Sequence, residues 1–160
     1  MEQLSKEQLE QTQLANECME EALQKLYEGN LKQAEAIVMR ACEIYESIND
    51  RTQQAAALNR LSVIYDEMGD ESMDLKCLLE ALDIVEDGVD NYLEAKLYNN
   101  LGSKFMNLKA YDRALQCLFA SEGALEKVSE EYLEHSSEVF SINSFRLILN
   151  LNFSFTYYHL

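Results

Sequence analysis

Proline and tryptophan are absent from this sequence, and glycine is scarce, with five residues among 160. Because proline and glycine mark most tight turns, a chain with so few of them is unsuited to a fold of many short strands. Leucine, alanine, glutamate, glutamine and lysine are abundant, and all are good helix formers. Hydrophobic residues make up 48% of the chain, enough to form a core. We therefore expect a single all-α domain over residues 1–160.

Basic residues are also few. The chain has 13 lysines and arginines against 29 aspartates and glutamates, which gives a formal net charge of −16. Non-specific nucleic-acid binding needs a basic surface, and an anionic membrane surface would repel this chain, so neither is an expected partner. We interpret most of the acidic residues as a solvated outer face. The alternative is a docking surface for a basic partner.

Long apolar runs are missing as well. The N-terminal residues MEQLSKEQLEQTQ are polar and acidic, unlike a signal peptide, and no apolar run approaches the ~20 residues that span a bilayer. We therefore expect a cytoplasmic protein. The four cysteines, Cys18, Cys42, Cys77 and Cys117, form no CxxC pair and have no histidine at metal-ligand spacing. They are predicted to be free buried thiols, with no metal and no cofactor.

Motifs of catalytic sites are not found. The sequence has no glycine-rich phosphate loop, no GxSxG and no HExxH. His135 and His159 lie apart, and His135 sits in an acidic, polar stretch. Paired carboxylates such as Asp66 and Glu67 resemble solvated helix faces, because an acid/base pair needs a pocket that separates the two pKa values. We therefore predict that the protein is not an enzyme.

An internal repeat of 40 residues organises the chain. GNLKQAEAIVMRACEIYE from Gly29 recurs as GDESMDLKCLLEALDIVE from Gly69 and as KAYDRALQCLFASEGALE from Lys109. The repeats span about 15–48, 55–88 and 95–128, and each contains two apolar stripes at helical spacing. Between the stripes, Gly69 can take the left-handed conformation that ends a helix and Asp70 can cap the next one. Gly29 and Asn30 are predicted to do the same.

A helix pair of this kind buries its apolar face only when it stacks on its neighbours. The third repeat has the pattern Tyr98-x2-Leu101-Gly102-x2-Phe105 followed by Ala114-x3-Leu118. This pattern resembles that of tetratricopeptide repeats, in the longer variety found in kinesin light chains, Pins-type adaptors and bacterial signalling proteins. The closing proline of the family is replaced by Glu46, Glu86 and Glu126. The resemblance implies a right-handed α-solenoid of antiparallel helix pairs, with about seven helices and a concave inner face.

The stretch NLNFSFTYY at residues 150–158 alternates apolar and polar residues, as a half-buried strand does. Shifted by 52 residues, however, it aligns with the first helix of the third repeat, and a lone strand has no partner. We therefore predict a buried helix, the start of a partial fourth repeat at 147–160 that follows an insertion at 129–146. Its second helix would be missing, so we expect an N-terminal fragment of a longer protein. The exposed end would favour self-association through Phe153, Phe155, Tyr157 and Tyr158.

In tetratricopeptide proteins the first helices of the repeats line a groove that holds a peptide or a partner helix, and asparagine side chains there bind its backbone. The resemblance places Asn59, Arg60, Asn99 and Asn100 in this groove. Helical spacing adds Lys96, Ser103 and Asn107, and the neighbouring repeats add Asn16, Met19, Asn152 and Phe155. The alternative is that these asparagines only solvate a helix or tie neighbouring helices together.

The leading hypothesis for function is a non-catalytic peptide-binding or protein-binding scaffold or sensory module. By analogy with bacterial proteins that carry such repeats, it would regulate an output domain, such as a GGDEF diguanylate cyclase, a kinase or a transcription regulator. The alternative is a structural module that drives self-association.

Overall fold

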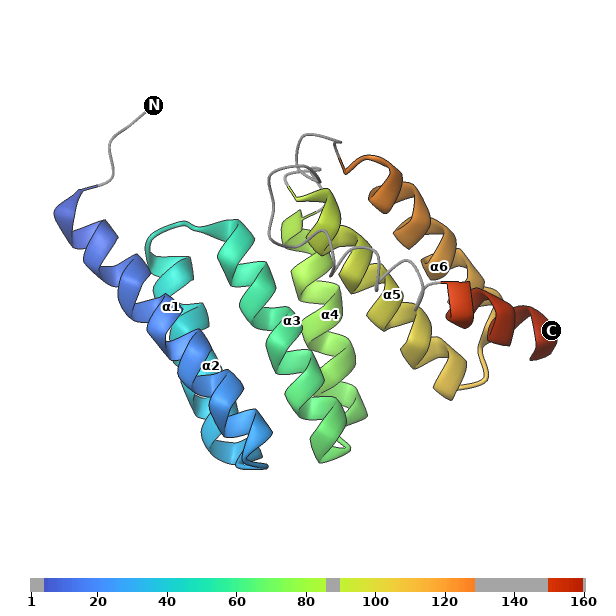
Figure 1. The fold of residues 1–160 in the computed structure, drawn as a ribbon, viewed down its shortest axis with the longest axis horizontal. Coiled ribbons are helices and arrows are strands. Elements are labelled where there is room, and N and C mark those ends of the chain that lie inside the picture. Colours follow the sequence, from blue (N-terminus) through green and yellow to red (C-terminus); the bar gives the residue numbers. More distant parts are fainter. Residues whose placement is uncertain (1–4, 86–89, 129–149, 160) are drawn as a thin grey trace. The chain divides into compact units, whose positions relative to one another are not determined.

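The computed structural model describes residues 5–85, 90–128 and 150–159, and within these ranges every regular element is an α-helix (Figure 1). The prediction of an all-α fold with about seven helices is confirmed. The chain divides into two compact units, Met1–Asp87 and Gly88–Leu160. The expectation of a single domain stays a prediction. No helix in the described part combines the length and apolar character that crossing a membrane requires.

The first unit contains four helices: α1 (Lys6–Tyr27), α2 (Leu31–Ser47), α3 (Arg51–Met68) and α4 (Glu71–Val85). Each packs on the next one along the chain. The second unit contains α5 (Asn91–Asn107), α6 (Tyr111–Glu126) and a helix at 150–159. The helices α2, α4 and α6 begin at residues 31, 71 and 111, so the 40-residue period of the sequence is also the period of the structure.

The turns between helices share one backbone conformation. The residue just before the N-cap has a positive φ in four of them: Gly29, Asn49, Gly69 and Lys109. Gly69, with φ 75°, is followed by Asp70, whose carboxylate accepts a hydrogen bond from the Met73 amide at 3.1 Å, as predicted. Asn30 is the N-cap residue of α2, as predicted, but the predicted capping by its side chain is wrong. Its side chain donates to Glu28 at 3.0 Å, and the helix start has no side-chain cap.

A close approach of two helices marks the centre of the α5–α6 pair. A Cβ atom placed on Gly102 would lie 3.1 Å from Leu118 Cδ2 and 3.4 Å from the Ala114 carbonyl oxygen. Leu118 is fully buried and belongs to the core of this unit. Small residues occupy the equivalent places in the first unit, where Ala22 and Ser62 are also buried. The sequence-based expectation of close contact at this place is therefore confirmed at Gly102.

Residues 150–159 form a helix, so the choice of helix over strand is confirmed. One side of this helix packs inward. The Phe153 ring lies 5.1 Å from the Phe119 ring of α6, and the Thr156 hydroxyl, which is fully buried, lies 2.9 Å from the Met106 sulfur of α5. The expectation that the whole helix is buried is wrong. It contacts its unit through one side, and Phe155 on another side is 50% exposed. The predicted insertion at 129–146 lies outside the described residues.

Candidate functional site

Four of the predicted groove residues lie in the first unit. On α1, the Asn16 amide oxygen accepts a hydrogen bond of 2.7 Å from the hydroxyl of Tyr45, which is buried on α2. Met19 on the same helix is half-buried, and so are Asn59 and Arg60 on α3. In this structure Asn16 therefore ties α1 to α2, which agrees with the alternative interpretation of the asparagines.

Replacing Asn16 with alanine is expected to lower the free energy of unfolding by about 1 kcal/mol, because the buried Tyr45 hydroxyl loses its acceptor. Gln13→Ala is the matched control, since Gln13 is exposed and bonds only within its own helix, to Glu17. Urea unfolding of the two variants checks this. Equal stability of both variants would contradict the structural role of Asn16.

In the second unit, three predicted groove residues meet. The Asn152 amide nitrogen lies 2.9 Å from the Asn99 side-chain oxygen and 3.3 Å from the Ser103 hydroxyl, and it can donate to both. Asn99 is 6% exposed, whereas Ser103 and Asn152 are half-buried. These contacts tie the helix at 150–159 to α5. The amides of Asn99 and Asn152 are thus engaged with each other, which again agrees with the alternative interpretation.

A double-mutant cycle on Asn99→Ala and Asn152→Ala is expected to give a coupling energy of about 1 kcal/mol, because two contacting side chains share one hydrogen bond. The measurement is urea unfolding of the two single variants and the double variant. Additive losses would show that this hydrogen bond does not form in solution.

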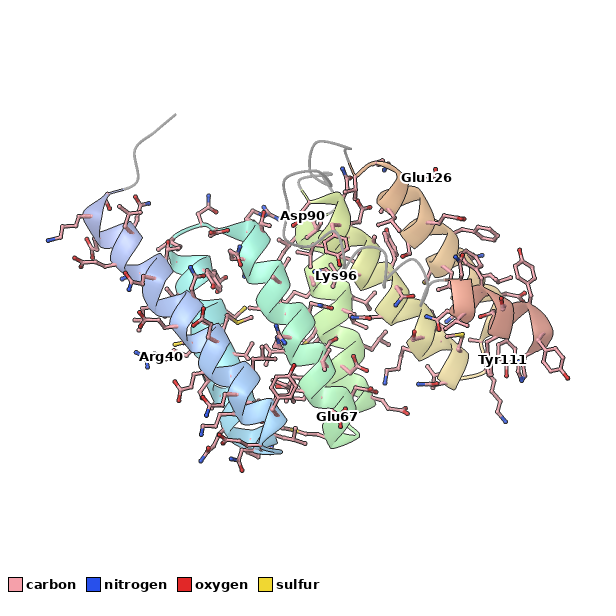
Figure 2. All side chains as sticks on the ribbon, viewed as in Figure 1. Arg40, Glu67, Asp90, Lys96, Tyr111 and Glu126 are labelled. Carbon is pink, nitrogen blue, oxygen red and sulfur yellow. The ribbon has the colours of Figure 1, made fainter. Side chains whose placement is uncertain are left out.

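The other predicted residues of the second unit differ in their exposure. Lys96, labelled on α5 in Figure 2, is half-buried, and its ammonium lies 4.4 Å from the centre of the Tyr92 ring. This is cation–π distance. Asn100 is half-buried and Asn107 is exposed. The Phe155 ring stacks on the His159 ring with centres 4.1 Å apart. Asn107 and Phe155 are thus the most exposed of the predicted residues in this unit.

A surface pocket lies at the start of α6 and was not predicted from the sequence. It measures about 330 Å³ and is lined by Lys109, Ala110, Tyr111, Asp112, Arg113 and His159. Lys109 and Arg113 carry positive charge and Asp112 carries negative charge, in a chain with a net charge of −16. Tyr111 is labelled at the start of α6 in Figure 2. The only sequence signal would have been the two basic residues that flank Tyr111, because His159 comes from a distant part of the chain.

Tyr65 and Glu35 join two helices of the first unit. The Tyr65 hydroxyl of α3 donates to a Glu35 oxygen of α2 at 2.9 Å. Burial, followed by this hydrogen bond, raises the pKa of Tyr65 to about 12. The pKa of Glu35 is lowered, chiefly because Lys32 donates a hydrogen bond of 3.0 Å to it. This pair therefore holds α3 against α2.

All four cysteines are free thiols, as predicted. Cys18, Cys77 and Cys117 are buried, but Cys42 is partly exposed, which corrects the expectation that all four are buried. Burial raises the pKa of Cys42, Cys77 and Cys117 to about 11 in each case. These three thiols are therefore protonated and weakly nucleophilic at neutral pH. Among the described residues, no group of three histidine, cysteine or acidic side chains is arranged to hold a metal ion.

Comparison with known proteins gave no match, whether against protein-family models, curated proteins or solved structures.

Proposed function

We propose that this protein is a non-catalytic binding module that holds a peptide segment of a partner protein on its second unit. The observation that carries the proposal is the exposed Phe155 ring, stacked at 4.1 Å on His159, which lines the pocket together with Lys109 and Arg113. The pocket has two positive side chains and one negative one, Asp112, so the apolar surface beside it suits a peptide that presents one apolar side chain and one carboxylate. Asn107, the last residue of α5, supplies an exposed amide two residues before Lys109 in the chain.

The repeat architecture supports this proposal. We propose that the helix pairs are antiparallel and stack into a right-handed α-solenoid of the tetratricopeptide kind, since their 40-residue register and the motif around Gly102 resemble that family. In such proteins the first helices of the repeats present peptide-binding residues. Phe155 occupies the place on its helix that Ser103 occupies on α5, at the shift of 52 residues. By analogy with bacterial proteins that carry such repeats, binding would regulate an output domain.

The test is selection from a random peptide library on the immobilised protein, followed by affinity measurements with variants. Arg113→Glu is expected to weaken the selected peptides about tenfold, because a repulsive charge replaces an attractive one in the pocket. Arg40→Glu is the matched control, since Arg40 is exposed on α2 in the first unit (Figure 2).

Phe155→Ala is expected to weaken the same peptides by a similar factor, through loss of the apolar contact. Tyr27→Ala, which removes an aromatic ring that is 84% exposed on α1, serves as its control. Peptides that bind all four variants as tightly as the original protein would overturn the proposal.

Self-association is the second candidate function, and the exposed side chains of the helix at 150–159 favour it. Leu151, Tyr157 and Tyr158 are 61%, 58% and 86% exposed. Phe153, which was predicted to belong to this surface, packs on Phe119 instead. Sedimentation equilibrium separates the two candidates, because self-association predicts a dimer that Tyr158→Asp dissociates, whereas peptide binding alone predicts a monomer.

A further inference from the structure

The His159 ring is oriented by three aromatic rings and one hydrogen bond. It stacks on the Phe155 ring with centres 4.1 Å apart, and the centres of the Tyr111 and Tyr158 rings lie 5.7 and 5.2 Å away. The Nδ1 atom of His159 lies 2.8 Å from the Phe155 carbonyl oxygen. These contacts give a defined orientation to a side chain that is otherwise exposed and lines the pocket at the start of α6.

The hydrogen bond to Phe155 determines which nitrogen of His159 is available to a ligand. A carbonyl oxygen only accepts hydrogen bonds, so the proton of the neutral ring lies on Nδ1, and Nε2 carries a lone pair. This lone pair cannot bond to a carboxylate, whose oxygens are also acceptors. A second proton makes Nε2 a donor and the ring a cation, and histidine undergoes this change between about pH 5 and pH 8. His159 therefore offers a carboxylate a hydrogen bond only in its protonated form.

The charges that line the pocket with His159 come from the start of α6. Lys109 and Arg113 are positive and Asp112 is negative, so these three side chains leave an excess of one positive charge. The other titratable groups that contact the ring are the phenols of Tyr111 and Tyr158, and phenols lose their proton only near about pH 10. A carboxylate that enters the pocket cancels the excess positive charge, so it favours the second proton on His159.

We propose that a peptide carboxylate binds in this pocket together with a proton on His159, so that the module binds its ligand more tightly as the pH falls. The protonated Nε2 donates a hydrogen bond to the carboxylate, and Lys109 and Arg113 supply further positive charge. This pH response rests on the peptide site proposed above, because it needs the ligand to bind there. The carboxylate belongs either to an acidic side chain or to the C-terminus of the peptide.

The probe is a library-selected peptide with one aspartate, acetylated at its N-terminus and amidated at its C-terminus. Its affinity for the full chain, measured by isothermal titration calorimetry, is expected to be about tenfold higher at pH 5.5 than at pH 8.5. The reason is that a neighbouring carboxylate shifts the protonation of a titrating group by about one pH unit or more. The aspartate itself is ionised at both pH values, because its ordinary pKa is about 3.9.

Two further forms of the peptide identify the source of the carboxylate. One has asparagine in place of the aspartate and keeps the amidated C-terminus, and its affinity is expected to be equal at the two pH values. The other has asparagine and a free C-terminal carboxylate. Tighter binding at pH 5.5 by the aspartate form supports a side-chain carboxylate, and tighter binding by the form with the free C-terminus supports a terminal one.

The variant His159→Phe tests the role of the imidazole. It keeps a ring against Phe155 and Tyr111 but has no proton to gain, so its affinity for the aspartate peptide is expected to be equal at the two pH values. His135→Asn, which removes the only other histidine of the chain, is the matched control. This control is expected to retain the tenfold difference.

Two results would overturn the pH response. The first is an equal affinity at the two pH values for every form of the peptide, and the second is a tenfold difference that His159→Phe retains. If Arg113→Glu still weakens the peptide in either case, the peptide site stands without a pH response. Peptides whose affinity is unchanged by both Arg113→Glu and Phe155→Ala would overturn the peptide site itself.

Discussion

Replacing Gly102 with leucine is expected to lower the free energy of unfolding of the second unit by about 2–3 kcal/mol. The Cβ atom alone would lie 3.1 Å from Leu118 and 3.4 Å from the Ala114 carbonyl oxygen, so the rest of the side chain has no space between α5 and α6. Overpacking of a well-filled core costs about 1–3 kcal/mol, and here it outweighs the roughly 1 kcal/mol that leucine gains over glycine in helix propensity.

Gly123→Leu is the matched control, because Gly123 lies in α6 and a Cβ atom there would meet nothing within 4 Å. This variant is expected to be more stable than the original protein by up to about 1 kcal/mol, through helix propensity alone. Urea unfolding followed by circular dichroism measures both variants. If Gly102→Leu were as stable as Gly123→Leu, this result would contradict the close packing of α5 on α6 at Gly102.

Raising the pH from 8.5 to 11 is expected to lower the free energy of unfolding of the first unit by roughly 3 kcal/mol or more. The pKa of Cys42 and of Cys77 is raised by burial to about 11, from an ordinary value near 9. Above pH 9 the unfolded chain loses these protons first, so the stability that is present below pH 9 is lost as the pH rises through 11. Each pKa unit corresponds to about 1.4 kcal/mol. Tyr65, with a pKa of about 12, extends the loss to higher pH.

The variant Cys77→Ala tests the origin of this loss. It is expected to reduce the decline between pH 9 and pH 11 by about 2 kcal/mol, because one of the two thiols with a raised pKa no longer titrates. The measurement is a series of urea unfolding curves at constant ionic strength. Parallel declines in the variant and the original protein would show that Cys77 does not titrate with the raised pKa.

Much of the fold could be predicted because it follows from local rules. The 40-residue register, the glycine turn at Gly69 with its cap Asp70, and the small residue at Gly102 all follow from spacing and backbone preference. The helix at 150–159 could be predicted from its alignment with α5, against its strand-like alternation. Asn30 shows the limit of such rules, because its side chain had a competing acceptor in Glu28.

The candidate site could be predicted only in part, because side-chain partners are set by tertiary contacts. Sequence places Asn16 and Asn99 on first helices, but it does not reveal that Tyr45 and Asn152 bind them. Likewise, Phe153 and Phe155 are two residues apart on one helix, and only the position of α6 decides which of them is covered. The pocket joins the start of α6 to His159, which no local pattern connects.

We propose that the protein binds a peptide at Phe155 and the neighbouring pocket. The most direct test is a titration of the isotopically labelled protein with a library-selected peptide, followed by amide chemical shifts in NMR spectra. We predict that the largest shift changes fall on Asn107, Arg113, Phe155 and His159. Changes confined to residues of α1 to α4, or no changes at peptide concentrations that saturate binding, would contradict the claim.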